Sequence, residues 1–221
     1  MRNAHTPRGW VFCCTDAKHN GGRIGGDADV ATSLAGLEMT LPDRYNATYK
    51  WLHWLLALGI AYAFGLGWVM TGMEGITPAK LRYFSWHKWL GVTLFVLSVA
   101  RIAWRGLSPP PELPATVSPL QRRAALWMHY ALYFATLAVP ISGYLHSLAA
   151  GFPVVYFGRF ELPVLFGKTP ALIEPLRLAH AWLSYAMAAG VLLHAAAALV
   201  HHFHYRDAVL TSMLPVSKRR P

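Results

Sequence analysis

The chain has 221 residues, of which 55% are hydrophobic and only 14% are charged. Soluble domains carry about 25% charged residues, so the composition argues against an ordinary water-soluble protein, and it excludes intrinsic disorder of the whole chain, which requires low hydrophobicity and high charge. The formal net charge of +10 is typical of proteins that bind nucleic acid or an anionic membrane, and because no nucleic-acid motif is present, we expect a lipid bilayer as the partner and no nucleic acid.

Residues 1–38 differ from the rest of the chain. They contain no long apolar run, and their middle is rich in glycine. We expect them to form a disordered N-terminal extension, or to be untranslated because the protein begins at Met39.

Four apolar stretches follow, at about 48–71, 84–105, 125–150 and 178–204. Each is long enough to cross a hydrocarbon core, which takes about 20 residues, and in lipid only a helix satisfies the backbone of such a run. We therefore expect residues 39–215 to form an all-α integral membrane four-helix bundle, with the connection 151–177 at the membrane interface and a basic cytoplasmic tail at 216–221.

The basic residues indicate the orientation, because cytoplasmic segments carry an excess of Lys and Arg. Four spans place both chain ends on one side, and that side would hold ten basic residues: Arg44, Lys50, Arg101, Arg105, Arg122, Arg123, Arg206, Lys218, Arg219 and Arg220. The other side would hold six: Lys80, Arg82, Lys88, Arg159, Lys168 and Arg177. The bias predicts that the N- and C-termini are cytoplasmic.

Four histidines within the apolar stretches are the candidate functional residues, since ionisable groups in membrane spans are costly and usually functional. His180 and His194 lie 14 residues apart in the last stretch, which places them on one helix face about 21 Å apart in depth. His87 matches the outer depth and His53 the inner depth. The expected pairs are therefore His87 with His180 and His53 with His194.

Paired imidazoles from neighbouring helices can hold haem iron without burying a charge. The spacing thus favours two bis-His haems between the helices, with Arg44, Lys88 and Arg101 as candidate partners for haem propionates. Gly91 and Gly143 would let a flat macrocycle approach a helix.

Two other functions stay open on spacing alone, a transition-metal transporter and a proton pathway. Both usually place acidic residues or soft metal ligands at the membrane midplane, and the four stretches contain no Asp or Glu. The remaining histidines of the bundle are interpreted as structural residues near the interfaces, where they can be solvated: His129, His146, His202 and His204.

Several segments together resemble the bacterial cytochrome b561 family of four-helix, di-haem inner-membrane proteins. They are RYNATYKWLHWLLA at 44–57, FSWHKWLGVTLFVLSVARIAWR at 84–105, LYFATLAVPISGY at 132–144 and HAWLSYAMAAGVLLHAAAALVHHFHYRD at 180–207, with an FG…LP stretch at 157–163. The resemblance covers Arg44 to about Leu214 and implies b-type haem on His53, His87, His180 and His194, all of which are present.

The resemblance also implies contact with quinone and location in the bacterial inner membrane. It suggests an oxidoreductase that oxidises superoxide at the outer face and reduces ubiquinone; the alternative is a cytochrome b carrier or anchor that passes electrons between quinone and a separate periplasmic or membrane partner. His201 lies seven residues after His194, about 10 Å further along nearly the same face, and is the candidate quinone contact.

Overall fold

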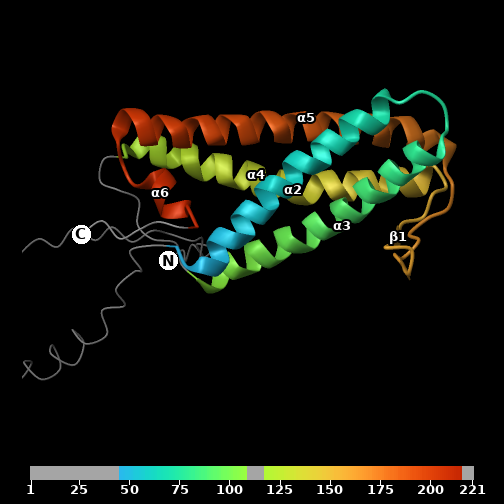
Figure 1. Cartoon of the computed structure of the whole chain (residues 1–221), viewed down its shortest axis with the longest axis horizontal. Helices are drawn as coiled ribbons and strands as arrows, with labels where there is room; N and C mark the ends of the chain where they lie inside the picture. The colour runs from blue at the N-terminus through green and yellow to red at the C-terminus, as the bar shows by residue number, and fades with distance from the viewer. Residues whose placement is uncertain (1–44, 109–116, 216–221) are drawn as a thin grey trace, which may run out of the picture. The chain divides into compact units, whose positions relative to one another are not determined.

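A computed structural model describes residues 45–108 and 117–215 of the chain (Figure 1). The expectations for residues 1–38, for Arg44 and for the tail at 216–221 lie outside these residues.

Four long helices make up most of the described chain and confirm the expected all-α bundle. The elements in chain order are α2 (Ala47–Gly72), α3 (Pro78–Leu107), α4 (Pro119–Ala149), β1 (Val155–Tyr156), β2 (Phe160–Glu161), α5 (Pro170–Val200), the π-helical turn η1 (His201–Tyr205) and α6 (Val209–Met213). Each of the four long helices is long and apolar enough to cross a membrane.

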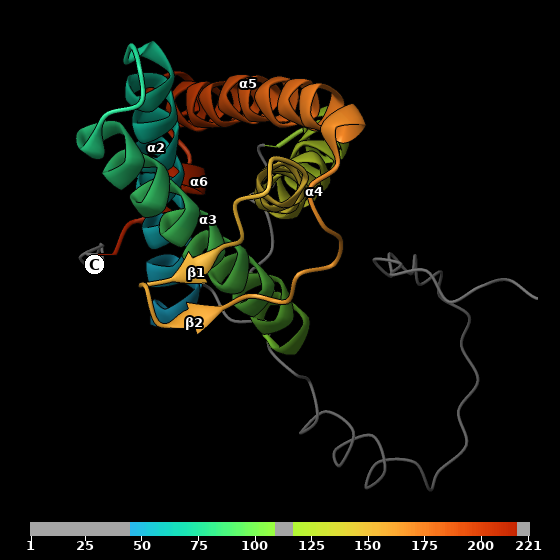
Figure 2. The same cartoon turned by 90° about the vertical axis from the view of Figure 1, so that its right-hand side faces the viewer.

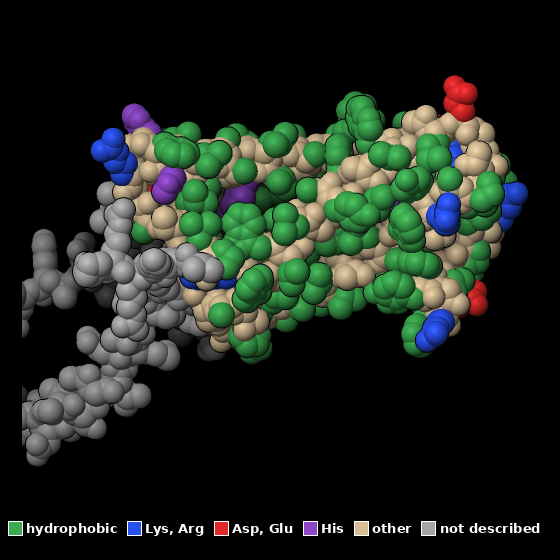
Figure 3. Space-filling view, viewed as in Figure 1, with side chains coloured by type: hydrophobic (Ala, Val, Ile, Leu, Met, Phe, Trp, Pro, Cys, Tyr) green, Lys and Arg blue, Asp and Glu red, His purple; other side chains and the backbone are tan. Residues whose placement is uncertain are grey.

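The bundle consists of two antiparallel helix pairs. Helix α2 packs along α3, α4 packs along α5, and α3 also packs against α4 (Figure 1). Large apolar side chains stay exposed along the helices; Leu58, Trp68 and Leu192, for example, are each about two-thirds exposed. In Figure 3 apolar side chains cover the middle of the visible face, while Lys and Arg lie toward its two ends. This distribution is the one that a bilayer requires.

Three helices begin earlier than the apolar stretches predict. Helix α3 begins at residue 78 rather than 84, α4 at 119 rather than 125, and α5 at 170 rather than 178. Each start has a proline at the first helical position after a hydroxyl residue: Thr77 and Pro78, Ser118 and Pro119, Thr169 and Pro170. Proline is favoured there because its missing N–H would have no partner. These polar first turns extend the helices beyond their apolar segments.

The connection between α4 and α5 folds into a small hairpin at one end of the bundle, which we call the hairpin end. Strands β1 and β2 pair antiparallel, and the turn between them places Phe157 and Gly158 at positive φ. The hairpin lies against α3 (Figure 2): the Trp89 indole donates a hydrogen bond to the Val155 carbonyl at 2.7 Å, and the Thr93 and Tyr156 hydroxyls are 2.8 Å apart.

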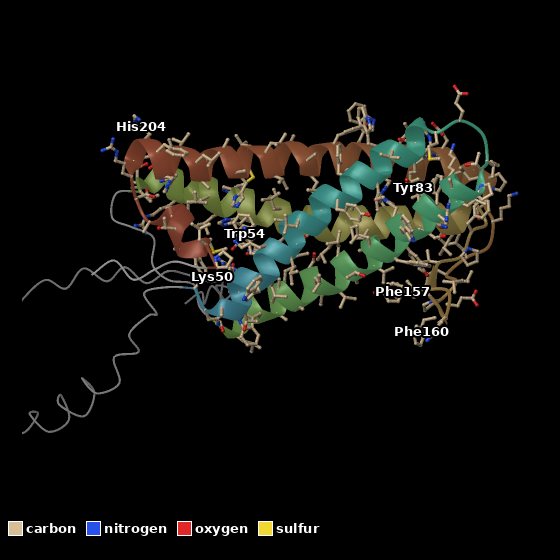
Figure 4. All side chains as sticks on the ribbon, in the orientation of Figure 1. Lys50, Trp54, Tyr83, Phe157, Phe160 and His204 are labelled. Carbon is tan, nitrogen blue, oxygen red and sulfur yellow. The ribbon has the colours of Figure 1, made fainter. Side chains whose placement is uncertain are left out.

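The short helix α6 closes the opposite end, which we call the α6 end. His201 Nδ1 donates to the Asp207 carboxylate at 2.6 Å, and the other Asp207 oxygen accepts from the Val209 N–H at 3.0 Å. Trp54 of α2, labelled in Figure 4, donates from its indole N–H to the Met213 carbonyl at 2.9 Å. These contacts hold α6 against Trp54, which directly follows His53 in the sequence.

The hairpin contact with α3 gives a first prediction. Trp89→Phe keeps an aromatic side chain but removes the indole N–H and its hydrogen bond to Val155. Because such a bond contributes ~1 kcal/mol, amide hydrogen exchange in residues 152–162 is expected to become about fivefold faster. Trp86→Phe is the matched control, because Trp86 is exposed, packs edge-on to the Tyr83 ring and forms no hydrogen bond through its indole within the described residues. Equal exchange in the two variants would show that the indole does not anchor the hairpin.

Candidate functional site

The four histidines singled out from the sequence lie in two pairs at different levels of the bundle. The rings of His87 and His180 have centroids 6.1 Å apart with an interplanar angle of 87°, and those of His53 and His194 are 6.2 Å apart at 67°. Helix α5 contributes one ring to each pair, while α3 and α2 contribute the others. The structure therefore brings together the residues that the 14-residue spacing placed at matching depths.

At the hairpin end, each histidine ring forms a hydrogen bond with a backbone carbonyl of a neighbouring helix. His87 Nδ1 lies 3.1 Å from the Ala63 carbonyl oxygen of α2, and His180 Nδ1 lies 3.0 Å from the Val139 carbonyl oxygen of α4. A carbonyl only accepts hydrogen bonds, so Nδ1 must donate in both rings. This fixes the tautomer and leaves Nε2 of each ring as a lone-pair donor.

A glycine one turn after each carbonyl makes room for the ring. A Cβ on Gly143 would lie 2.8 Å from His180 Cε1, and a Cβ on Gly67 would lie 3.4 Å from His87 Cε1. Gly143 therefore makes room for the imidazole itself, and its expected role toward a macrocycle stays a prediction. Gly91 has no neighbour within 4 Å of a Cβ among the described residues.

At the α6 end, His53 faces a cation instead of a carbonyl. Arg101 of α3 places its Nη2 3.1 Å from His53 Nδ1, as its position 14 residues after His87 predicts. His194 forms no hydrogen bond through its ring nitrogens within residues 45–108 and 117–215. The two pairs thus share their ring spacing and differ in what surrounds Nδ1.

Aromatic rings surround the Arg101 side chain. Its guanidinium lies 5.1 Å from the Tyr49 ring centroid and 5.6 Å from that of Tyr133, distances that allow cation–π attraction. Arg105, one turn later, donates to the Tyr49 hydroxyl at 3.1 Å. Tyr45 stacks on Tyr49 at 4.7 Å, and burial raises the pKa of its hydroxyl. Arg101 Nε is buried and has no acceptor within the described part of the chain.

His129 of α4 is the residue whose position the sequence interpretation missed. It was assigned to a solvated interface, but its ring centroid lies 5.4 Å from that of His194 and 6.5 Å from that of Tyr133. The signal was the i, i+4 spacing of His129 and Tyr133, which places both on one helix face. The α6-end level therefore has a third imidazole.

The other two candidates in the described residues contact groups outside the two pairs. Lys88 Nζ donates to the Phe152 carbonyl at 3.4 Å and lies 5.7 Å from the Phe152 ring, at the hairpin end. His201 lies in the π-helical turn and is engaged by Asp207 through Nδ1.

The geometry of each pair suits one metal ion held between two imidazoles. With metal–nitrogen distances of about 2 Å, two rings on opposite sides of an ion have centroids roughly 6 Å apart. Among the residues that the structure describes, no group of three or more His, Cys, Asp or Glu could hold a metal ion. The histidines therefore offer two ligands per level, which fits a metal whose remaining ligands come from a macrocycle.

Comparisons with known proteins agree with this arrangement. A family model described as prokaryotic cytochrome b561 matches residues 44–216. "Cytochrome b561 homolog 2" of Escherichia coli (strain K12) is 35% identical over 173 residues, which is 78% of this chain and 92% of that protein. "Probable superoxide oxidase CybB" of Yersinia pestis is 27% identical over 176 residues, 78% of this chain and 96% of that protein.

"Cytochrome b561 homolog 1" of Escherichia coli (strain K12) is 27% identical over 182 residues, 80% of this chain and 99% of that protein. The family match covers all four long helices and both histidine levels. This chain therefore belongs to the prokaryotic cytochrome b561 family, whose members carry b-type haem and transfer electrons across a membrane.

Proposed function

We propose that the chain holds two b-type haems, one at each histidine level, and carries electrons between the two faces of the bacterial inner membrane. The observation that carries the proposal is the pair of matched ring spacings, 6.1 and 6.2 Å, at two levels of one bundle. His87 and His180 would be the ligands at the hairpin end, and His53 and His194 those at the α6 end. Bound haem supplies a one-electron carrier at each level.

The residues present fit this cofactor in two further respects. At the hairpin end the carbonyls fix Nδ1–H, so Nε2 of both rings is available to iron. At the α6 end the buried Arg101 Nε lacks an acceptor among the described residues, and a haem propionate would provide one with a complementary charge. Lys88 is the corresponding candidate at the hairpin end, and Arg44 a further one in the part that is not described.

The proposed donor is superoxide at the hairpin end and the proposed acceptor is ubiquinone. Two superoxide anions release two electrons and leave as two O₂ molecules; the electrons, with two protons, reduce one ubiquinone to ubiquinol. Six basic residues lie at or near the hairpin end and would attract an anion: Lys80, Arg82, Lys88, Arg159, Lys168 and Arg177. The name of the Yersinia pestis relative supports the same substrate.

The orientation follows from the same charges. Counted along the sequence, ten basic residues belong to the side of the chain ends and six to the other side, which favours the cytoplasm for the side of the chain ends. Superoxide would then react on the periplasmic side.

His201 is the proposed quinone contact. A quinone carbonyl needs a hydrogen-bond donor and, on reduction, a proton, and imidazole can supply both. His201 Nδ1 donates to Asp207, whose side chain is only 3% exposed. The carboxylate holds the ring in one orientation and takes the Nδ1–H. Nε2 would therefore donate to a quinone carbonyl from the doubly protonated ring and pass that proton to the reduced quinone.

Haem content tests the ligand assignment. The detergent-purified chain is expected to contain two b haems by pyridine haemochrome, and His194→Ala is expected to contain one, because the α6-end level loses one of its two imidazoles. If the parent contains no haem after expression with adequate haem supply, the proposal is contradicted, and the transition-metal transporter becomes the favoured function.

The glycine positions give a sharper test of the hairpin-end site. Gly143→Ala brings a methyl group to 2.8 Å from His180 Cε1 and is expected to remove about one haem per chain, whereas Gly67→Ala, at an ordinary contact distance of 3.4 Å, should keep both. The two substitutions add the same group at equivalent places, so equal haem content would argue against a docked His180 ring.

Superoxide-dependent reduction of a ubiquinone analogue by the purified chain in proteoliposomes tests the reaction. We expect saturable activity, and His201→Ala is expected to raise the KM for quinone about tenfold, the effect of one lost hydrogen bond of ~1.4 kcal/mol. His204→Ala, at an exposed position of the same turn (Figure 4), is the control. Two bound haems without this activity, together with co-purification of a redox subunit, would favour the carrier alternative.

A further inference from the structure

The two histidine levels offer different surroundings to a bound metal, and the difference lies at Nδ1. Both hairpin-end rings donate Nδ1–H to a backbone carbonyl, at 3.1 and 3.0 Å. A carbonyl acceptor increases the basicity of the ring and strengthens it as a ligand to the oxidised metal. At the α6 end neither ring has such an acceptor in the described residues, and His53 Nδ1 instead faces Arg101 Nη2 at 3.1 Å.

A guanidinium differs from a carbonyl in both hydrogen bonding and charge. It carries five N–H donors and no acceptor, and it stays protonated in proteins. In the structure Arg101 Nη2 therefore donates to His53 Nδ1. A His53 ring that binds iron through Nε2 would instead carry its proton on Nδ1, where it has no acceptor among the described residues and a fixed positive charge beside it. Both effects weaken the preference of this site for the ferric state.

The charge of Arg101 is not neutralised by the side chains around it. Its guanidinium contacts the His53 ring and the faces of Tyr49 and Tyr133, none of which is an anion. The second cation, Arg105, contacts the Tyr49 hydroxyl and the Tyr133 ring. Within the described residues neither guanidinium forms an ion pair with Asp or Glu, and in a medium of low dielectric constant such charges act strongly on a nearby site.

Within the described residues the hairpin end has no cation in hydrogen-bond contact with its rings. Lys88 is directed to the Phe152 carbonyl and ring in the connection after α4. The His180 Nδ1 lies near the Val139 carbonyl and the Ser142 hydroxyl, which is 3.1 Å away. Reduction of ferric to ferrous iron removes one positive charge, so the level with a guanidinium against its ring favours the reduced form more, even where a propionate on Arg101 Nε offsets part of that charge.

We infer that Arg101 sets the direction of electron transfer, by raising the midpoint potential of the α6-end haem above that of the hairpin-end haem through its contact with His53. This inference rests on the proposed binding of one haem at each level. In each transfer one electron leaves the hairpin-end site, which is oxidised, and enters the α6-end site, which is reduced. With the proposed orientation, electrons move downhill from the periplasmic to the cytoplasmic side.

Spectroelectrochemical titration of the purified di-haem protein tests the inference. The parent is expected to show two midpoints. Arg101→Gln, which removes the charge and keeps a side chain of similar length, should lower the higher midpoint and leave the lower one in place. Arg105→Gln is the matched control: its guanidinium is one turn away and forms no hydrogen bond to a histidine within the described residues, so its shift should be smaller.

Single-haem variants assign the midpoints. His87→Ala should retain only the α6-end haem and titrate near the higher parent midpoint, while His53→Ala should retain only the hairpin-end haem and titrate near the lower one. The reverse assignment overturns the inference whatever Arg101→Gln does. An unchanged or raised α6-end midpoint in Arg101→Gln also overturns it, and a raised one would indicate that His53 Nδ1 is deprotonated and accepts from the guanidinium.

If Arg101→Gln loses haem, its α6-end midpoint cannot be measured. Arg101→Lys then tests the inference, because it keeps the charge without the planar donor group. This variant should keep its higher midpoint above the lower one, and inverted midpoints would overturn the inference. A parent with fewer than two haems contradicts the proposed function itself, and the inference falls with it. Two haems with the opposite order of midpoints leaves the proposed function standing and rejects only the role of Arg101.

Discussion

The constraint on which the structure depends is that a polar group inside the hydrocarbon core must find its partner within the protein. The backbone N–H and C=O groups form hydrogen bonds within each helix. The imidazoles and guanidiniums of the spans must find partners in other side chains or in the backbone of neighbouring helices. The hairpin-end rings use carbonyls that neighbouring helices expose beside a glycine, at Ala63 with Gly67 and at Val139 with Gly143. At the α6 end Arg101 uses a ring nitrogen of His53 and the faces of two tyrosines.

The same constraint explains how the bundle is assembled. Helix α5 supplies a ring to both levels because one straight helix can carry two residues on one face 14 positions apart. Helices α2 and α4 hold the hairpin-end rings in place, since a backbone carbonyl of each helix accepts a hydrogen bond from a ring of another helix. Gly143 of α4 is needed because a Cβ there would lie 2.8 Å from the His180 ring, whereas a Cβ on Gly67 of α2 would lie at an ordinary 3.4 Å from the His87 ring.

The sequence predicted the four helices and the histidine pairs because both depend on spacing along a helix, which local geometry determines. The helices begin before the apolar stretches because hydropathy does not register polar first turns, although the Ser or Thr followed by Pro at 77, 118 and 169 marks them. The partners of the rings could not be predicted. That Ala63 serves His87, or that His129 lies beside His194, depends on how helices rotate against each other.

The Arg101 side chain connects the cofactor with the stability of the bundle. Its Nε is a buried donor without an acceptor in the described residues, and such a group typically costs about 1–3 kcal/mol. An anionic group that arrives with a cofactor removes this cost in the folded state and has no comparable effect on the unfolded chain. Binding therefore stabilises the fold by linkage. The guanidinium cannot be neutralised by losing its proton, so it keeps its charge beside His53 whether or not its Nε is satisfied. In our proposal this single residue would make the α6 end the level that depends more on an anionic partner and the level with the greater affinity for an electron, with a propionate on Nε offsetting only part of the charge beside His53.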